Sequence, residues 1–146
     1  MNTPRHIVVV GALVRNREDA ILLIRHPKRG WEIPQGRVEE GESLTAAIHR
    51  EVLEETGLPV KLGPLAVVSS KISPPPAVVF QFLATCRGGI PRTSAESLEV
   101  GWYSRREALR LVTHPVNRDR LTTLLAFSGE VLFRSYTTGP YRMLSE

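Results

Sequence analysis

The sequence predicts an α/β domain in which helices pack on both faces of a mixed β-sheet, forming an α/β/α sandwich. Segments with strand character lie on both sides of one long amphipathic helix, and further helices are predicted late in the chain. The length of 146 residues suits one domain with a substantial core. We therefore expect a single domain over residues 1–146. For the tail, residues 131–146, three alternatives stay open: an added strand, packing against a second subunit, or disorder.

The N-terminal part of the chain predicts a β-hairpin. His6 to Val14 is rich in β-branched and apolar residues, which is typical of a central strand. Asn16 to Asp19 predicts a turn, and Ala20 to Ile24 predicts the returning strand. A basic loop, Arg25 to Gly30, then leads into the segment Trp31 to Gly36.

The next element is a helix with clear start and stop signals. Ser43 is a suitable N-cap, because its hydroxyl can accept a hydrogen bond from a backbone N–H of the first turn. Gly57 supplies the left-handed residue that ends many helices, and Leu58 supplies the apolar contact beyond it. We therefore expect a helix between Ser43 and Gly57.

Carboxylates occupy part of the apolar stripe of this helix. Helical spacing from Leu44 passes through apolar residues and then reaches Glu51 and Glu55, with Glu54 beside them. Facing the core, such a cluster is costly unless it is protonated or neutralised by a cation. A solvated acidic face is the alternative, but the charged positions share the buried stripe and the helix contains no lysine. Hard oxygen donors suit Mg²⁺, so the pattern favours a metal site.

The region from Gly36 to Leu58 resembles the Nudix box, written G-x5-E-x7-R-E-U-x-E-E-x-G-U, where U is a bulky aliphatic residue. Every specified position is matched, by Gly36, Glu42, Arg50, Glu51, Val52, Glu54, Glu55, Gly57 and Leu58. A match of this length is far more specific than a short glycine motif.

The resemblance implies the Nudix fold and a metal-dependent hydrolase. It implies cleavage of a phosphoanhydride bond in a nucleoside diphosphate linked to a further group, with Mg²⁺ or Mn²⁺ as cofactor. The implied metal ligands are Glu51, Glu55 and Glu54, completed by the carbonyl of Gly36. Glu42 and Arg50 are expected to hydrogen-bond to these ligands without touching the metal and so to orient them. Arg50 and Glu54 are also candidate catalytic residues.

After the box, the pattern returns to strands. Val60 to Ile72 predicts a long strand, or a pair of strands broken at Gly63-Pro64. Ser73 to Pro76 predicts a stiff extended loop. Ala77 to Thr85 and Glu99 to Tyr103 predict two further strands.

Two helices are predicted near the C-terminus. Ser104 to Glu107 forms a capping box, which opens a helix through about Val112. Pro115 suits a first helical position and opens another helix. The buried face of that helix is expected to carry Leu121, Leu124 and Leu125.

The segment Ser94 to Tyr103 is similar to a family segment that precedes a strand. Some members place a metal-binding or general-base glutamate in this loop, which makes Glu96 the candidate and Glu99 the reserve. Both residues are equally compatible with exposed loop carboxylates.

Substrate clues in the sequence disagree. The proline run at Pro74 to Pro76 resembles the ADP-ribose pyrophosphatase group, which is slightly favoured. Gln35, in place of a commoner glycine, resembles members that act on dinucleoside polyphosphates or RNA 5′ ends. Candidate substrate-binding residues are Arg25, Lys28, Gln35 and Glu99. A Nudix-like regulator that binds a nucleotide without turnover is a further alternative.

Composition and charge limit the cellular compartment and the kind of partner that we expect. No apolar run approaches the length of a membrane span, and the single cysteine, Cys86, excludes an internal disulfide, which points to the cytoplasm. The net charge is +4, but the basic residues are scattered, so a small nucleotide is favoured over nucleic acid as partner. We expect a monomer or a homodimer.

Overall fold

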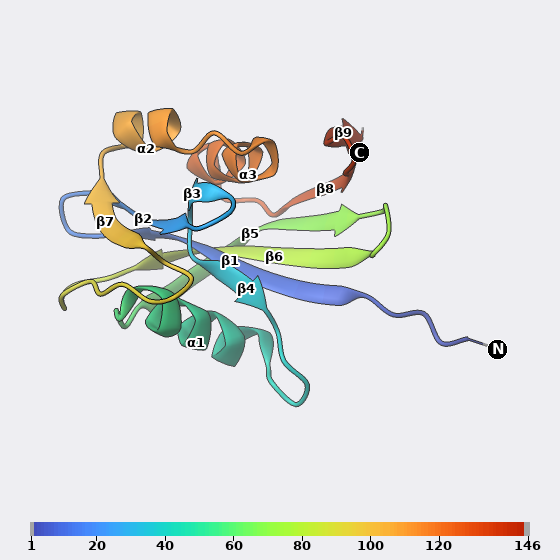
Figure 1. The fold of residues 1–146 in the computed structure, drawn as a ribbon, viewed down its shortest axis with the longest axis horizontal. Coiled ribbons are helices and arrows are strands. Elements are labelled where there is room, and N and C mark those ends of the chain that lie inside the picture. Colours follow the sequence, from blue (N-terminus) through green and yellow to red (C-terminus); the bar gives the residue numbers. More distant parts are fainter. Residues whose placement is uncertain (1, 145–146) are drawn as a thin grey trace.

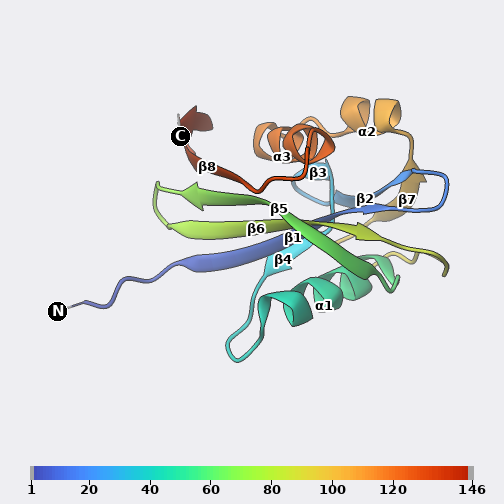
Figure 2. The same cartoon turned by 180° about the vertical axis from the view of Figure 1, so that it is seen from behind.

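A computed structural model of the chain, which describes residues 2–144, shows a mixed β-sheet between helices (Figure 1). Helix α1 covers one face of the sheet, whereas α2 and α3 cover the other, as the view from behind also shows (Figure 2). The predicted α/β/α arrangement is therefore confirmed.

The described residues form one nine-stranded sheet with the order β3-β2-β1-β6-β5-β8-β9, in which β4 pairs with β1 and β7 pairs with β2. The strands are β1 (Ile7–Arg15), β2 (Ile21–His26), β3 (Gly30–Glu32), β4 (Gln35–Arg37), β5 (Lys61–Lys71), β6 (Ala77–Thr85), β7 (Glu99–Tyr103), β8 (Leu132–Thr137) and β9 (Arg142–Leu144). The helices are α1 (Leu44–Thr56), α2 (Arg105–Leu111) and α3 (Pro115–Leu125). Strands β1 and β6 are parallel, as are β5 and β8, and the other pairs are antiparallel.

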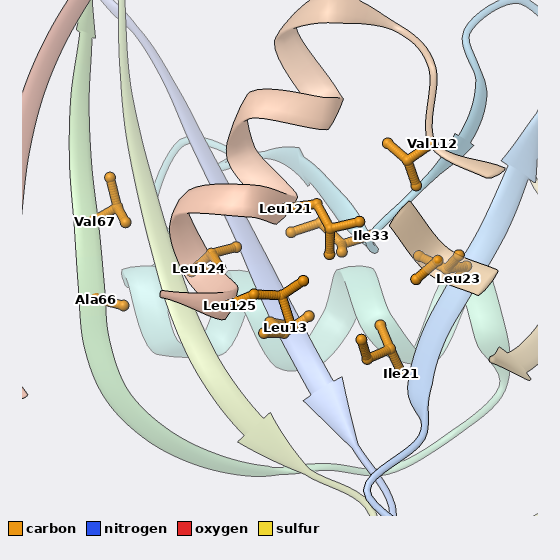
Figure 3. Close-up of a cluster of buried hydrophobic side chains, with 11 residues drawn as sticks. Leu13, Ile21, Leu23, Ile33, Ala66, Val67, Val112, Leu121, Leu124 and Leu125 are labelled. Carbon is orange, nitrogen blue, oxygen red and sulfur yellow. The ribbon is translucent and has the colours of Figure 1, made fainter. Parts of the chain in front are cut away.

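Alternation along the strands divides the core between the two faces of the sheet. Val10, Ala12 and Val14 of β1 pack toward α1, whereas Leu13 packs with residues of α3. Figure 3 shows the second group between the strands and the late helices. Its labelled members are Leu13, Ile21, Leu23, Ile33, Ala66, Val67, Val112, Leu121, Leu124 and Leu125. The three leucines predicted on the inner face of α3 are thus buried.

The signals at the ends of α1 are confirmed by its geometry. The Ser43 hydroxyl accepts a hydrogen bond from the Ala46 N–H at 3.1 Å. Gly57 has φ of 74°, and its N–H donates to the Leu53 carbonyl at 2.8 Å. Both ends are set by local chemistry, which fixes the register of the glutamates between them.

One predicted element differs from the structure, and for another the structure decides between the two predicted alternatives in favour of one long strand. Arg25 and His26 lie in β2 and not in a loop, because β3 and β7 pair with this end of the strand. Gly63-Pro64 does not split the strand around it, because β5 continues past it along β6 with register shifts. Close packing explains the glycine, since a Cβ at Gly63 would lie 2.9 Å from the Leu83 carbonyl oxygen.

The tail adds strands, which was one of the three alternatives. Strand β8 extends the sheet beside β5, and β9 folds back on it as a hairpin. Residues 145 and 146 lie outside the described part of the chain. Within residues 2–144, the helices lack the length and apolar character needed to cross a bilayer.

Candidate active site

The candidate site lies where α1 faces β4. Glu55 is 5% exposed, and one of its oxygens, Oε1, accepts a hydrogen bond from the backbone N–H of Gln35 at 2.9 Å. Glu51 lies one helical turn earlier on the same side of α1, and its side chain is 13% exposed. Both glutamates therefore lie on the inward stripe that their spacing predicts, with Glu55 buried and Glu51 partly buried.

Gly36 makes room for one of these carboxylates. A Cβ built at Gly36 would lie 2.1 Å from Glu51 Cδ and 2.3 Å from each of its oxygens. No side chain can occupy that space without displacing the carboxylate. The Gly36 backbone and the Glu51 carboxylate are thus held in direct contact.

Burial makes both carboxylates reluctant to ionise. It raises the pKa of Glu55 to about 9, and the charges of Glu51, Glu32 and Glu96 add to the effect. Burial likewise raises the pKa of Glu51, although Arg50 opposes the change. Such a pair is suited to a divalent cation, which would take the place of the protons.

Arg50 connects the rest of the box. Its Nε and Nη2 donate to both oxygens of Glu42 at 2.6 and 2.8 Å, and Nη2 also donates to the Arg37 carbonyl at 3.0 Å. Its Nη1 contacts Glu51 at 2.9 Å and Glu54 at 3.3 Å. The hydrogen bonds from Arg50 lower the pKa of Glu42 to about 2. Glu42 is therefore ionised, and its negative charge holds the Arg50 guanidinium in place. Arg50 in turn orients two of the predicted ligands.

Glu54 and Glu96 lie at the solvent side of the site. The side chain of Glu54 is 61% exposed, and Glu96 stands on the exposed loop before β7. This loop is anchored to the end of α1, because Ser97 Oγ donates to the Glu55 carbonyl at 2.5 Å and the Arg92 N–H donates to the Thr56 carbonyl at 2.8 Å. Ser97 is fully buried, so its contact fixes the backbone next to Glu96, whose charge acts on both Glu51 and Glu55.

The predicted substrate-binding residues differ in the contacts that they make. Arg25 forms an ion pair with Glu99 across β2 and β7, so each provides the countercharge of the other. Lys28 stands exposed in the turn between β2 and β3. Gln35 is the member of this group that hydrogen-bonds to a predicted metal ligand, through its backbone N–H and Glu55.

Sequence reasoning missed a buried polar network beside Gln35. Glu32 is fully buried and accepts hydrogen bonds from Arg29 at 2.8 and 3.0 Å, from Asn117 at 2.7 Å and from Gln35 at 2.7 Å. Gln35 also donates to Asn117 Oδ1 at 3.1 Å and accepts from Arg120 at 2.8 Å. The network joins β3, β4 and the first turns of α3.

A signal for part of this network was present in the sequence. Asn117 lies four and seven residues before Leu121 and Leu124, so it belongs to the buried stripe of α3. A polar residue on a buried stripe requires a partner, just as the glutamates of α1 do. The identity of that partner was not encoded nearby.

A cleft lies beside this network and Gly36 of β4. Its volume is about 280 Å³, and its lining comprises Val9, Arg29, Gln35, Gly36, Arg37, His114, Val116, Asn117 and Arg120. A larger cavity of about 440 Å³ lies between the end of α3, β5 and β8 and is lined by none of the residues of the predicted site. The smaller cleft is the one that contains residues of the predicted site, because Gly36 and Gln35 line it.

The residues offer a partial metal shell. In the described part of the chain, no three His, Cys, Asp or Glu side chains converge closely enough to hold a metal ion. Glu51 nevertheless lies against Gly36 and Glu55 against Gln35, so two carboxylates meet β4 at neighbouring residues, and Mg²⁺ usually takes waters and substrate phosphates for the rest of its shell. The donor set therefore fits a divalent cation that is completed by substrate.

Without metal, the free energy of unfolding should fall as the pH rises from about 4.5 to 9. The ordinary pKa of Glu55 is 4.5 and the folded value is about 9, so the folded protein binds more protons than the unfolded chain in this window. Glu55→Gln should remove this loss and raise Tm in EDTA at pH 8 by on the order of 5 °C. Thermal unfolding of both proteins at pH 6 and pH 8 checks this, and parallel shifts of Tm would contradict it.

Comparisons with known proteins identify the family and the fold of the chain. The family model described as the NUDIX domain matches residues 5–125. The 8-oxo-dGDP phosphatase NUDT18 of Homo sapiens is 42% identical over 105 residues, which cover 66% of this chain and 32% of that protein. The MutT-like protein of Streptomyces ambofaciens is 36% identical over 105 residues, which cover 71% of this chain and 68% of that protein.

A solved structure shows the same architecture along nearly the whole chain. The crystal structure of the MutT protein from Bacillus halodurans matches with a TM-score of 0.80 and 28% identity and covers 95% of both chains. In contrast, this chain spans about a third of the length of the NUDT18 proteins of Homo sapiens, Danio rerio and Mus musculus.

Proposed function

The chain belongs to the NUDIX domain family, and from this premise we propose that it is a Mg²⁺-dependent pyrophosphohydrolase of nucleoside diphosphate derivatives. Hydrolases of this family use a divalent metal and act on nucleotide phosphoanhydrides. Mn²⁺ is the alternative ion, and the single cysteine favours the cytoplasm as the compartment.

The observation that carries the proposal is the contact between the buried glutamates and β4. Glu55 Oε1 is occupied by the Gln35 N–H, so Oε2 is the oxygen offered to a cation. Glu51 lies against Gly36, which brings the Gly36 backbone beside the same carboxylates. Glu51, Glu55 and the Gly36 carbonyl would therefore hold the ion, with Glu54 as a further ligand. When bound, the ion lowers the pKa of a water and neutralises charge that develops on the phosphate oxygens.

The remaining residues of the site orient the metal ligands or accept a proton. Arg50 keeps Glu51 and Glu54 oriented, and its own position is fixed by Glu42. Glu96 is the carboxylate that we assign to take a proton from the attacking water, because its loop is anchored at the end of α1. Glu54 is the alternative, since it lies on the same side of the helix at the solvent boundary.

The cleft supplies a place for the nucleotide. Its lining comes from Gly36 and Gln35 of β4 on one side and from Asn117 and Arg120 of α3 on the other, and Gln35 is hydrogen-bonded to both α3 residues. Amide and guanidinium groups can donate to the carbonyl and ring nitrogens of a base or to phosphate oxygens. We propose that the phosphates lie at the β4 end and that the base lies toward α3.

Two substrates deserve direct comparison. The proline run favours ADP-ribose, and it forms the turn between β5 and β6. An oxidised guanine nucleotide is the second candidate, because proteins named 8-oxo-dGDP phosphatase are among the relatives that match. Dinucleoside polyphosphates and RNA 5′ ends are further candidate substrates, because Gln35 resembles the residue found in family members that act on them. A nucleotide-binding regulator without turnover is the alternative from another class.

A substrate panel tests the proposed function. Purified protein is incubated with 8-oxo-dGDP, ADP-ribose, dGTP, diadenosine tetraphosphate and 5′-triphosphorylated RNA, each with Mg²⁺, with Mn²⁺ or with EDTA. We expect phosphate, pyrophosphate or nucleoside monophosphate release with metal and none in EDTA, because the carboxylates act through the ion. If metal-loaded protein binds a nucleotide of the panel but turns over none, the regulator is the correct interpretation.

A further inference from the structure

The hairpin of β8 and β9 is tied to the active site by hydrogen bonds. We propose that Tyr136, in β8, is a positioning residue of the hydrolase, which acts through Arg120 and Gln35 on Glu55. This inference rests on the proposed function. It concerns a part of the chain that lies after residue 125, where the match to the family model ends.

The connection consists of three consecutive hydrogen bonds. Arg120 Nη2 donates to the Tyr136 hydroxyl at 3.2 Å, and Arg120 Nη1 donates to Gln35 Oε1 at 2.8 Å. The backbone N–H of the same Gln35 donates to Glu55 Oε1 at 2.9 Å. Tyr136, Gln35 and Glu55 are 4%, 8% and 5% exposed, so water competes little for these bonds.

Gln35 can pass a displacement of Arg120 on to Glu55, because both ends of its side-chain amide are held by hydrogen bonds. Its Nε2 donates to Glu32 and Asn117 while its Oε1 accepts from Arg120. Since the guanidinium group can only donate, Arg120 fixes which end of the amide faces it. A rotation of the amide would break several buried hydrogen bonds and shift the β4 backbone that holds Glu55.

Arg120 suits the connecting role for a geometric reason. The guanidinium group is planar, so its two terminal nitrogens keep a fixed separation and orientation. Tyr136 holds one of these nitrogens and thereby sets the direction of the other toward Gln35. Without the hydroxyl, the side chain of Arg120 is free to turn into the cleft that it lines.

Tyr141 provides a matched control in the same hairpin. Its hydroxyl donates to Asp119 Oδ2 at 3.0 Å, and Arg134 pairs with the same carboxylate at 2.9 Å. Tyr141 thus ties the hairpin to α3 as Tyr136 does, and the two rings pack together with centroids 5.6 Å apart. Its hydrogen bond, however, leads to Asp119 and not to Gln35.

The experiment compares Tyr136→Phe with Tyr141→Phe in the full chain. We expect Tyr136→Phe to lower kcat/KM about fivefold and to raise the Mg²⁺ concentration that gives half-maximal rate, whereas Tyr141→Phe changes kcat/KM less than about twofold. A purely structural role would lower Tm in both variants and leave the Mg²⁺ dependence unchanged. In a Gln35→Met background, Tyr136→Phe should have no further effect, because the connecting amide is gone.

Two results would overturn the inference: equal kinetic effects of the two phenylalanine variants, or an undiminished effect of Tyr136→Phe in the Gln35→Met background. If Tyr136→Phe fails to fold, Arg120→Lys replaces it, since lysine keeps the charge but cannot hold both acceptors in one plane. If the wild type hydrolyses no nucleotide, the proposed function fails by itself. The positioning role is then tested by NMR. The Gln35 backbone amide resonance should shift in Tyr136→Phe and stay in place in Tyr141→Phe.

Discussion

Replacing Glu55 by glutamine should lower kcat by at least about 10³-fold while the fold is retained, because a metal ligand loses its charge at a site where the ion contributes several kcal/mol. The amide keeps the size of the carboxylate, and its oxygen can still accept the Gln35 N–H. Burial raises the pKa of Glu55 to about 9. Glutamine is uncharged, so the substitution removes the free-energy cost of ionising a buried carboxylate. The loss of activity should therefore accompany equal or higher stability.

Steady-state kinetics at saturating Mg²⁺, together with circular dichroism and Tm, measure this result. Glu40→Gln is the matched control, since Glu40 is an exposed glutamate of the loop before α1 and makes the same change of charge. We expect its kcat to stay within about twofold of the wild type, as for a surface substitution. Wild-type turnover in Glu55→Gln would show that Glu55 is not a metal ligand.

The second large effect is expected from Gly36→Ala. The added methyl group would lie 2.1 Å from Glu51 Cδ, so either the carboxylate or the β4 backbone must move. A displacement of this size should lower kcat/KM about 100-fold, because misplacement by about 1 Å is enough for such a loss. The Mg²⁺ concentration for half-maximal rate should rise as well, since Glu51 leaves its place against Gly36.

Gly88→Ala is the control for this substitution. A Cβ at Gly88 meets no atom within 4 Å, so the same chemical change adds no contact there. Rates as a function of Mg²⁺ and Tm values for both variants separate a local effect on the site from general destabilisation. A Gly36→Ala enzyme with wild-type kcat/KM and Mg²⁺ dependence would disprove the assigned contact.

Elements defined by local patterns were predicted well. Strands β6 and β7 have the predicted bounds, α3 begins at Pro115, and Ser43 and Gly57 cap α1 as expected. These features depend on neighbours within a few residues, so the chemistry that determines them is present in short stretches of sequence. For the same reason, the inward position of Glu51 and Glu55 followed from helical spacing alone.

Elements defined by pairing were predicted less well. Arg25 belongs to a strand because β7, which lies far along the chain, pairs with it through Glu99. Glu32 and Asn117 meet although they stand 85 positions apart, as do Gln35 and Arg120. No periodicity within either segment specifies such a partner, because the contact depends on how β3, β4 and α3 pack in three dimensions.

The sequence by itself determined the carboxylate face of α1, its caps and the family, because a helix with a fixed period places side chains from local spacing. Only the tertiary structure decided that Gly36 faces Glu51, that Gln35 holds Glu55, and that the C-terminal hairpin reaches the site through Arg120. The physical reason is that these contacts join strands and helices distant in sequence. Their geometry is set by sheet register and core packing, which no single segment encodes.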